Sequence, residues 1–232
     1  IASQSVQDSN GHGTHCTGTA CGPAIPRTRV RRYGVAAESS IYIGKVLSNE
    51  GRGTDGSIIA GIQWALRHGC KVISMSLGGR PGREYSRTYE QLANYALSQN
   101  CLLIAAAGND SRRPGNIQPV SHPANCPSIL AVGALNQRLD IAPFSNGQIY
   151  PDAKVDIAAP GVNGFSSWTR GSHQSISGTS MATPHVAGIA ALLFEKYPQA
   201  GANQIWRRIV QLARPIPVPI RDAGAGLAQV PR

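Results

Sequence analysis

The sequence predicts an α/β fold with three layers, in which helices cover both faces of a mostly parallel sheet. Short apolar stretches of strand type alternate along the chain with longer stretches whose apolar residues recur at the helical period. Strands that alternate with helices at this spacing form right-handed crossovers, which produce a parallel sheet covered on both faces. The chain has 232 residues, enough for one complete core, so we expect a single domain over residues 1–232.

The first half of the chain contains two strand–helix pairs. Ile41–Leu47 has the apolar composition of a strand. Thr54–His68 carries apolar residues at helical spacing, and Gly69 follows it as the expected C-terminal cap. Lys71–Ser76 is the next expected strand, and a capping-box spacing predicts a helix over residues 88–100.

The second half continues this alternation and ends in a proline-containing tail, residues 215–232, which we expect to be extended. The further expected strands cover residues 101–105, 128–134 and 155–158, and the further expected helices cover residues 179–197 and 203–213. In open α/β sheets the functional site lies beyond the carboxyl ends of the strands. Side chains that follow a strand or begin a helix are therefore the candidates for chemistry.

The charge of the chain is strongly basic, at a formal +10, with arginines clustered at residues 27–32, 112–113 and 207–208. Such clusters suit either an acidic partner, such as nucleic acid, or a solvated surface. No cluster is interleaved with aromatic residues as a stacking platform, so we interpret them as solvated and expect no specific nucleic-acid partner. No apolar run approaches the ~20 residues that a membrane-spanning helix needs, so we expect no membrane association.

The cysteines number five, so at least one of them lacks an intrachain partner. A disulfide scaffold is not expected at this chain length, although one disulfide is left open. Two of the cysteines begin apolar runs, where a free thiol behaves as a small hydrophobic side chain. The five are Cys16, Cys21, Cys70, Cys101 and Cys126.

A serine stands at the start of a predicted buried helix. The turn Gly178-Thr179-Ser180 leads directly into a run of small and apolar residues. Such a position presents the hydroxyl at a cleft, close to the positive end of the helix dipole. A serine hydroxyl is a poor nucleophile unless a base removes its proton, so a catalytic Ser180 requires a histidine.

Among the histidines, His12 is flanked by glycines at a predicted helix start, and His15 follows one turn later. The two histidines could instead bind a metal ion, with Cys16 and Cys21 as further ligands. A metal site would leave the distant Gly-Thr-Ser turn unexplained, whereas one acyl-transfer mechanism uses both motifs. We therefore favour an acyl-transfer site over a metal site at these two histidines.

Acyl transfer also needs hydrogen-bond donors for the tetrahedral oxyanion. Residues 102–107 form an apolar run that ends in Gly108-Asn109. The Asn109 carboxamide is a side-chain donor of the kind that such an oxyanion needs. By itself, a Gly-Asn pair after a strand indicates only a turn. Its place between the other two motifs favours the functional interpretation.

These three motifs together resemble those of the subtilisin-like serine proteases, the subtilases. The phrase His-Gly-Thr-His-Cys at residues 12–16 is similar to that of the proteinase K branch of the family. The resemblance extends from Asp8 to about Val230 and implies a serine endopeptidase domain. It implies that Ser180 is the nucleophile, His12 the general base and Asn109 the oxyanion donor. Cys16, four residues after His12, is expected on the same helix face, behind the base.

The resemblance also implies which segments bind the substrate. Ser76-Leu77-Gly78 looks like the edge that pairs with a peptide backbone, and Gly51-Arg52-Gly53 looks like the opposite edge. An extended peptide would then lie between them as a middle strand. Gly108, Asp110 and Ser121 correspond to the pocket for the P1 side chain. An acid at the pocket rim predicts a preference for basic P1 residues.

The triad carboxylate is the part that this sequence lacks. In subtilases the aspartate precedes the histidine and follows an apolar strand. Asp8 is the sole acid before His12 and follows no such strand, so we expect it to support the helix N-terminus instead. Three explanations are open: an Asp upstream of residue 1 with the first strand and helix, an inactive protein, or an unexpected acid. The first is preferred, because a parallel sheet without its first strand leaves backbone groups unpaired.

The expected function is therefore that of a serine endopeptidase with its Asp upstream of residue 1. Two alternatives remain: an inactive subtilase-fold domain that binds peptides or acts as a scaffold, and a peptide ligase or cyclase. The expected partners are an extended peptide or protein substrate and a propeptide or N-terminal fragment, and the expected location is secreted or extracytoplasmic. No cofactor is required. Calcium is common in the family, and a structural ion is left open although no clear site supports it. The loop of residues 22–33 has no acid, and a weaker site near residues 121–127 or 136–140 stays open.

Overall fold

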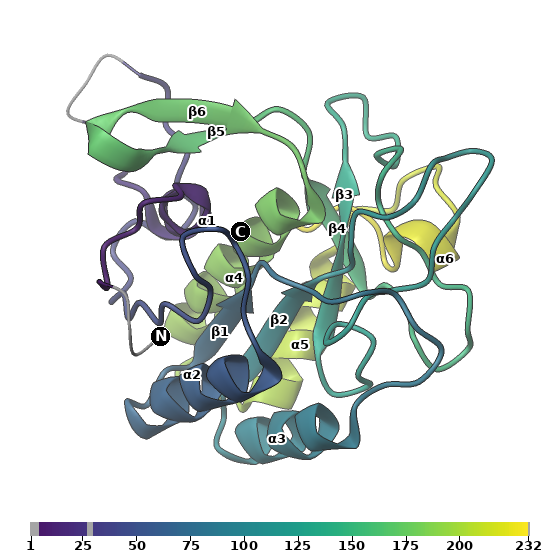
Figure 1. The fold of residues 1–232 in the computed structure, drawn as a ribbon, viewed down its shortest axis with the longest axis horizontal. Coiled ribbons are helices and arrows are strands. Elements are labelled where there is room, and N and C mark those ends of the chain that lie inside the picture. The colour runs from purple at the N-terminus through teal and green to yellow at the C-terminus, as the bar shows by residue number, and fades with distance from the viewer. Residues whose placement is uncertain (1–4, 27–29, 232) are drawn as a thin grey trace.

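A computed structural model describes residues 5–26 and 30–231 of the chain. Its main sheet contains four strands in the order β1-β2-β3-β4, and every neighbouring pair is parallel (Figure 1). The strands are β1 (Val72–Met75), β2 (Leu102–Ala106), β3 (Leu130–Leu135) and β4 (Ile157–Pro160). The strand order follows the chain order, as expected when each strand joins the sheet next to its predecessor.

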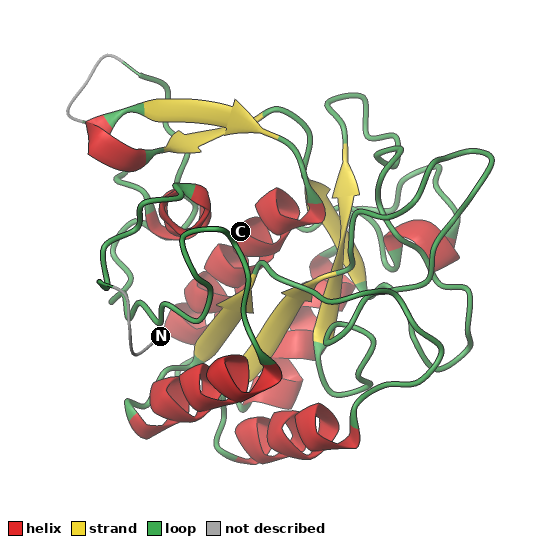
Figure 2. Cartoon of the chain, in the orientation of Figure 1, coloured by secondary structure: helices red, strands yellow, loops and turns green. Residues whose placement is uncertain are grey.

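Helices cover both faces of this sheet, which confirms the predicted three-layer fold (Figure 2). The helices are α2 (Asp55–Arg67) and α3 (Arg87–Ser98) on one face, and α4 (Thr179–Lys196) and α5 (Ala202–Leu212) on the other. Alternate residues of β2 point to opposite faces. Leu102 and Ile104 pack in the core that contains α4 and α5, whereas Leu103 packs in the core that contains α2 and α3.

Every residue of β2 and β3 is buried, because helices cover both of their faces. The predicted continuous apolar strands are therefore explained by two-sided burial. Helix α2 ends as predicted, with the left-handed Gly69 (φ 69°) directly after the last turn. Helix α3 begins after Ser86 and has no side-chain cap, so the capping box predicted from Thr88 is wrong.

The segment Ile41–Leu47 was expected to be a strand, and this prediction is wrong for the structure. It pairs with no strand among the described residues. Ile41, Tyr42 and Ile43 are 49%, 51% and 62% exposed, which is unusual for three successive large apolar side chains. A strand requires a neighbour to satisfy its backbone groups. The described part of the sheet ends at β1, whose Ser74 is exposed, and provides no such neighbour for this segment.

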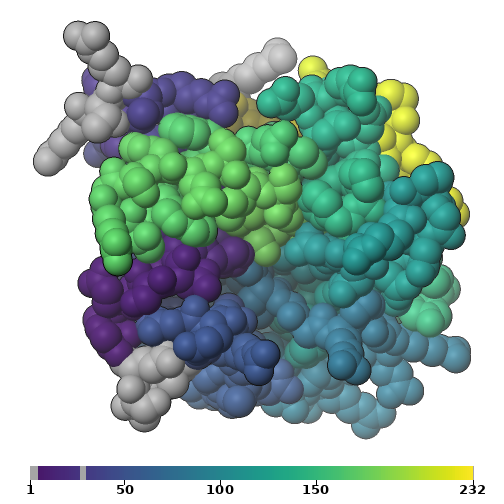
Figure 3. Space-filling view, turned by 45° about the horizontal axis from the view of Figure 1, so that its top comes forward, coloured from purple at the N-terminus to yellow at the C-terminus, as the bar shows by residue number. Residues whose placement is uncertain are grey.

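Other elements lie outside the main sheet. Helix α1 (His12–Cys21) starts where a helix start was predicted. The sequence did not predict the antiparallel hairpin formed by β5 (Gly164–Ser167) and β6 (His173–Ile176), with the short helix η1 (Thr169–Gly171) between them. The hairpin lies against α1 in Figure 1, and the same two segments adjoin in Figure 3. Three hydrogen bonds join them: from Ser166 Oγ to the His15 carbonyl at 2.9 Å, between His15 Nε2 and the Gly164 carbonyl at 2.9 Å, and from Ser167 Oγ to the Thr14 carbonyl at 3.4 Å.

The C-terminal tail contains a short helix, α6 (Ile220–Ala223), so it is not extended throughout as predicted. Of the first arginine cluster, residues 27–29 lie outside the described residues, and Arg31 stacks its guanidinium over the Phe165 ring at 5.1 Å. All five cysteines are free. Within the described ranges, no helix combines the length and the apolar character that crossing a membrane would require.

Candidate active site

Ser180 lies in the first turn of α4, at the end of the helix that faces the loops after the strands. Its hydroxyl donates a hydrogen bond to the Ser76 carbonyl at 3.3 Å. Ser76 follows β1 directly, so the carboxyl end of a strand and the N-terminus of a helix meet here. This is the place that the sheet topology predicts for a functional site.

Pro184 explains why the carbonyl group of Ser180 faces the same site. In a regular helix, the N–H of the residue four positions later would donate to this carbonyl, but proline has no N–H. The Ser180 carbonyl instead accepts a hydrogen bond from Ser76 Oγ at 2.7 Å and one from the Cys16 thiol at 3.5 Å. Because Pro184 has no N–H, the Ser180 carbonyl can link α4 by hydrogen bonds to the residue after β1 and to α1.

Asn109 follows β2 and is held by the residue next to Ser180. Its Oδ1 accepts hydrogen bonds from the backbone N–H of Thr179 at 2.8 Å and from the Thr179 hydroxyl at 3.0 Å. The Gly108 N–H in turn donates to the Thr179 hydroxyl at 3.2 Å. Because Oδ1 is occupied on the α4 side, the amide Nδ2 is left as a donor near the start of α4.

His12 is the first residue of α1, and its preceding residue has a special backbone. Gly11 has φ 100°, a left-handed conformation that side chains disfavour, and a Cβ there would overlap the Trp168 ring. Burial lowers the pKa of His12, with a further decrease from the nearby charge of His15, and the Asp8 charge opposes them. The imidazole is therefore neutral at pH 7, as a general base must be.

Cys16 brings α1 and α4 together at the site. Its sulfur lies 4.0 Å from His12 Nδ1 and also contacts the Ser180 carbonyl, so His12 and Ser180 flank one thiol. The predicted position of Cys16 behind the histidine is confirmed. Burial raises the pKa of this thiol to about 11, so it remains protonated at neutral pH and is not a thiolate nucleophile.

Asp8 supports the N-terminus of α1, as the sequence predicted. Its Oδ1 accepts from the backbone N–H groups of Asn10 (2.9 Å) and Gly11 (2.8 Å), and its Oδ2 accepts from the N–H (2.8 Å) and hydroxyl (2.7 Å) of Thr14. Burial alone would raise the pKa of Asp8, but these hydrogen bonds lower it to about 2. In the described part of the chain, no carboxylate hydrogen-bonds to His12, so the structure places no triad acid.

The two expected substrate edges lie on different elements. Ser76-Leu77-Gly78 continues β1 past the site, and Gly79 N–H donates to the His122 carbonyl at 2.8 Å. Gly78 and Gly79 are exposed and leave backbone accessible. Gly51-Arg52-Gly53 forms an exposed turn before α2, closed by a hydrogen bond from the Ser48 N–H to the Arg52 carbonyl at 2.7 Å.

The three residues expected at the P1 pocket do come together, around an asparagine that the sequence did not reveal. Asn146 Nδ2 donates to Asp110 Oδ2 at 3.0 Å and to Ser121 Oγ at 3.1 Å, and a Cβ on Gly108 would contact both Asn146 and Ser121. Ser121 is only 1% exposed, so its hydroxyl lies behind the surface, whereas Asp110 is exposed. Asp110, not Ser121, is thus the accessible polar group.

No cluster of three or more His, Cys, Asp or Glu side chains that could hold a metal ion occurs among the residues described. His12 and Cys16 face α4, which does not supply the further ligands of a metal pair. In the turn 136–140, the Asp140 carboxylate is engaged by Asn136 at 3.1 Å and by Arg138 at 3.5 Å. The Asn125 carboxamide oxygen is buried without a partner in the described part, but no carboxylate cluster accompanies it. These residues do not fit a carboxylate-based calcium site.

Three residues at this site carried no distinctive sequence signal. Thr179 and Pro184 stand within the motif of Ser180, yet their roles depend on partners about 70 and more than 100 positions away in the chain. Asn146 lies in a loop with an ordinary turn composition, and only its burial identifies it. A local pattern does not report such long-range hydrogen bonds.

Comparisons with known proteins find relatives that match most of this chain. The Peptidase_S8 model, described as the subtilase family, matches residues 2–227. Subtilisin DY of Bacillus licheniformis is 40% identical over 206 residues, which cover 89% of this chain and 71% of that protein. The thermostable alkaline protease of Halalkalibacterium halodurans is 42% identical over 209 residues, which cover 90% of this chain and 54% of that protein. The chain thus spans between about half and seven tenths of these curated relatives.

A solved structure has the same fold. The protein named Sphericase superposes with a TM-score of 0.87 at 30% sequence identity, and the match covers 98% of this chain and 80% of that one.

Proposed function

Because the chain belongs to the subtilase family of serine endopeptidases, we propose that it hydrolyses peptide bonds with Ser180 as nucleophile and His12 as general base. The observation that carries this proposal is the junction at Ser180. There the end of β1, the start of α4 and the His12 helix converge through Ser76 and Cys16.

In the proposed mechanism, Ser180 Oγ attacks the carbonyl carbon of the scissile peptide bond while His12 Nε2 accepts the hydroxyl proton. His12 Nδ1 faces the Cys16 thiol, so Nε2 is the ring nitrogen left for this transfer. The protonated imidazole then donates to the leaving amine, which gives an acyl-enzyme on Ser180. A water molecule then attacks this ester while His12 accepts its proton. The bond from the acyl carbon to Ser180 Oγ breaks as His12 returns the proton to Oγ, and the acid product is released.

The oxyanion formed in each half-reaction would accept hydrogen bonds from Asn109 Nδ2 and the Ser180 backbone N–H. Two contacts from Thr179 to Oδ1 support this role, because they direct the opposite end of the carboxamide toward the site. The Ser180 N–H is among the first N–H groups of α4, which have no helical acceptor and are free to bind an anion.

We propose that the carboxylate that orients His12 comes from a polypeptide segment outside residues 1–232. The unpaired segment Ile41–Leu47 and the exposed Ser74 of the edge strand β1 support this, because both leave backbone that an additional strand would satisfy. The expected neighbour is an apolar strand, since Ile41, Tyr42 and Ile43 are exposed. The carboxylate would end that strand beside His12.

The proposed substrate is an extended peptide that pairs with Ser76-Leu77-Gly78 on one side and with Gly51-Arg52-Gly53 on the other. A propeptide or N-terminal fragment is the proposed further partner. Secretion is proposed from the likeness to subtilisins, and no cofactor takes part in the proposed chemistry. A peptide ligase would use the same acyl-enzyme and differ only in the nucleophile that resolves it.

A fluorophosphonate probe tests the proposal, because it labels only a serine that a base activates. We expect labelling of Ser180 in the full-length gene product, and its loss in the Ser180→Ala and His12→Ala variants. Ser177→Ala is the matched control, since this exposed hydroxyl lies three residues earlier and accepts from the Asn163 N–H at 2.9 Å. Absence of labelling in the full-length product would instead favour an inactive peptide-binding domain.

Labelling of the 232-residue chain alone separates the remaining possibilities. If the carboxylate lies outside these residues, we expect this chain to react far more slowly than the full-length product. In subtilisin-type triads, removal of the aspartate alone costs on the order of 10⁴ in turnover. Equal rates would show that an acid within residues 1–232 completes the triad.

A further inference from the structure

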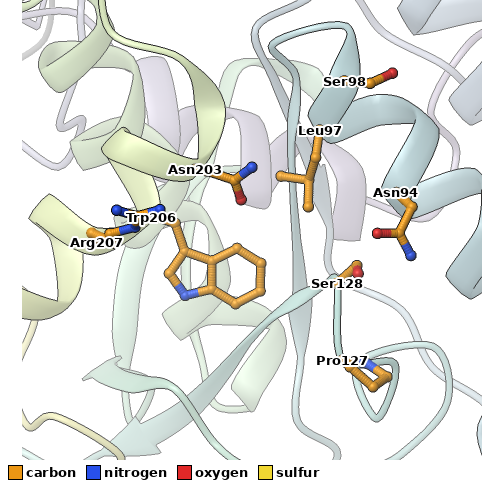
Figure 4. Close-up of a pocket in the computed structure, with 8 residues that line it drawn as sticks. All are labelled: Asn94, Leu97, Ser98, Pro127, Ser128, Asn203, Trp206 and Arg207. Carbon is orange, nitrogen blue, oxygen red and sulfur yellow. The ribbon is translucent and has the colours of Figure 1, made fainter.

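Two hollows lie on either side of α5, apart from the candidate active site. The first, of about 530 Å³, lies between α3 and α5 (Figure 4) and is lined by Asn94, Leu97, Ser98, Pro127, Ser128, Asn203, Trp206 and Arg207. The second, of about 590 Å³, lies between the end of α4 and α5. Arg207 lines both hollows, so they meet at this side chain and form one surface across the helix.

This surface is distant from the proposed chemistry. Ser180 stands in the first turn of α4 and Lys196 is the last residue of that helix. At 1.5 Å rise per residue, the two are roughly 24 Å apart along the helix axis. The surface is therefore not part of the substrate cleft.

The second hollow is basic. Lys196, Arg207 and Arg208 all line it, together with the glutamines at 199, 204 and 211, and neither hollow is lined by an Asp or Glu. The Arg208 guanidinium lies 3.9 Å from the centre of the Tyr197 ring, which holds this side chain in place. Buried Ile205 and Ile209 fix the opposite side of α5 in the core, so the basic side must face outward.

The Glu90 carboxylate contacts two residues that line the first hollow, so its negative charge lies beside that hollow and not in the basic second one. Glu90 Oε1 accepts from Asn94 Nδ2 at 2.8 Å and from Ser128 Oγ at 2.6 Å, while Oε2 accepts from the Ser128 N–H at 3.0 Å. Glu195, next to Lys196, is the acid of the last turn of α4 and does not line either hollow.

Figure 4 shows the Trp206 ring in the first hollow, between Asn203 on its own helix and Leu97 and Ser128 across from it. The indole is half-buried against the core, and the hollow beside it is lined by amide and hydroxyl groups together with Leu97 and Pro127. A flat apolar ring beside amides and hydroxyls suits a sugar ring, which has one apolar face and hydroxyl groups at its edge.

Nucleic acid fits this surface less well. Proteins that bind single strands combine basic grooves with open aromatic faces on which bases stack. Here the Tyr197 ring in the basic hollow is covered by Arg208 at 3.9 Å, and Lys196 lies 5.9 Å from its centre. The aromatic ring that remains accessible, Trp206, lies among amides in the other hollow.

We propose that this face, the α5 surface formed by Trp206, Arg207, Arg208, Lys196, Asn94 and Asn203, binds an acidic polysaccharide. A sugar ring packs on Trp206, with its hydroxyls donating to Asn94 Oδ1, whose Nδ2 is bound to Glu90, and hydrogen-bonding to the Asn203 carboxamide. The carboxylate or sulfate groups of neighbouring sugars bind Arg207 and Arg208, whose guanidinium groups suit planar and tetrahedral anions. Such a surface would hold the protein on an anionic matrix while leaving the cleft about 24 Å away open to substrate.

Binding of the full chain to polygalacturonate, dextran sulfate, neutral dextran and poly(dT) at low salt tests this. We expect binding to polygalacturonate, dextran sulfate or both, and no binding to neutral dextran. Tighter binding to polygalacturonate would indicate a preference for carboxylates, and tighter binding to dextran sulfate a preference for sulfates. The R207Q/R208Q variant should bind at least about tenfold more weakly, because two charge-assisted contacts are lost. W206F should weaken polysaccharide binding about threefold and leave poly(dT) binding unchanged.

R67Q/R138Q is the control, because it removes the same charge from exposed positions elsewhere on the chain. An equal loss in this control would overturn the proposal in favour of general charge attraction. Tighter binding to poly(dT) than to both polysaccharides, or an unchanged affinity in W206F, would overturn it as well. Equal melting temperatures of all variants show that a loss of binding is not a loss of fold.

Discussion

The side-chain oxygen of Asn109 accepts two hydrogen bonds from Thr179, one from its backbone N–H at 2.8 Å and one from its hydroxyl at 3.0 Å. The two residues come from the end of β2 and the first turn of α4, 70 positions apart in the chain. This contact sets which end of the carboxamide faces the site. It links the orientation of the proposed oxyanion donor to the same helix turn that carries Ser180.

We expect Asn109→Leu to reduce kcat and leave KM nearly unchanged, because the oxyanion forms only in the transition state. Removal of the equivalent asparagine donor in subtilisin itself costs about 10²–10³ in kcat, and the same order is expected here. Steady-state kinetics of the full-length product on a peptide substrate measure this effect.

Thr179→Val serves as the companion variant, since it keeps the backbone contact to Asn109 and removes the hydroxyl, which donates to Asn109 and accepts from the Gly108 N–H. Its kcat should fall by less, about fivefold, which corresponds to the loss of the one neutral hydrogen bond to the carboxamide. A larger kcat loss for Thr179→Val than for Asn109→Leu would contradict this account of the carboxamide.

Asp8→Asn should destabilise the protein in a pH-dependent way. The folded pKa of Asp8 is about 2, below its ordinary 3.8, so its carboxylate contributes stability that is complete above about pH 4 and lost as pH falls toward 2. Allowing for partial exposure, we expect a loss of about 1–2 kcal/mol at pH 7 and much less near pH 2. Urea unfolding at the two pH values measures it. The exposed Asp140→Asn is the control, and a pH-independent loss would contradict the prediction.

The His122 ring contacts Asp55 of α2 and Tyr89 of α3, and we expect the Asp55 charge to affect the pKa of this ring. Its Nε2 lies 3.8 Å from Asp55 Oδ1, the same oxygen that accepts from the Tyr89 hydroxyl at 3.2 Å, and the Tyr89 ring meets the imidazole edge-on at 4.4 Å. Burial lowers the pKa of His122, and the Asp55 charge opposes this decrease. Removing that charge in Asp55→Asn should therefore lower the pKa of His122 further.

NMR titration of the His122 ring protons in both proteins measures this shift. Because the folded pKa lies below the unfolded value, protonation favours the unfolded state, and stability falls as pH drops below about 6.5. This fall should be larger in Asp55→Asn. The Asp55 side chain is 71% exposed, so high salt should reduce the difference. An unchanged His122 pKa in Asp55→Asn would show that the pair is not coupled.

Asp110 should favour a basic P1 side chain by a modest factor, because its carboxylate is exposed at the proposed pocket. We expect Asp110→Asn to reduce the ratio of kcat/KM for Lys over Leu at P1 by about two- to fivefold, the effect of a solvent-exposed ion pair. Raising the salt concentration should reduce the wild-type ratio in the same direction. No preference for Lys, or a preference that salt leaves unchanged, would contradict this role.

The sequence by itself predicted the alternation of helices and strands and the positions of Ser180, His12 and Asn109 at element ends. It could do so because periodicity, glycine placement and the order of motifs are local properties. It failed at Ile41–Leu47, whose composition is that of a strand. Whether such a segment forms one depends on a neighbouring strand, and the described residues provide none.

Only the tertiary structure decided which partners each site residue has. Thr179 orients the Asn109 carboxamide from 70 positions away in the chain. Pro184 leaves the Ser180 carbonyl without a helical donor, and the distant Ser76 hydroxyl binds it instead. The burial of Ser121 also depends on groups far away in sequence. The structure likewise showed that the Arg208 guanidinium packs on the Tyr197 ring, which fixes this side chain on the α5 surface. Hydrogen bonds and packing form between elements only after the chain has folded, so a local pattern does not encode them.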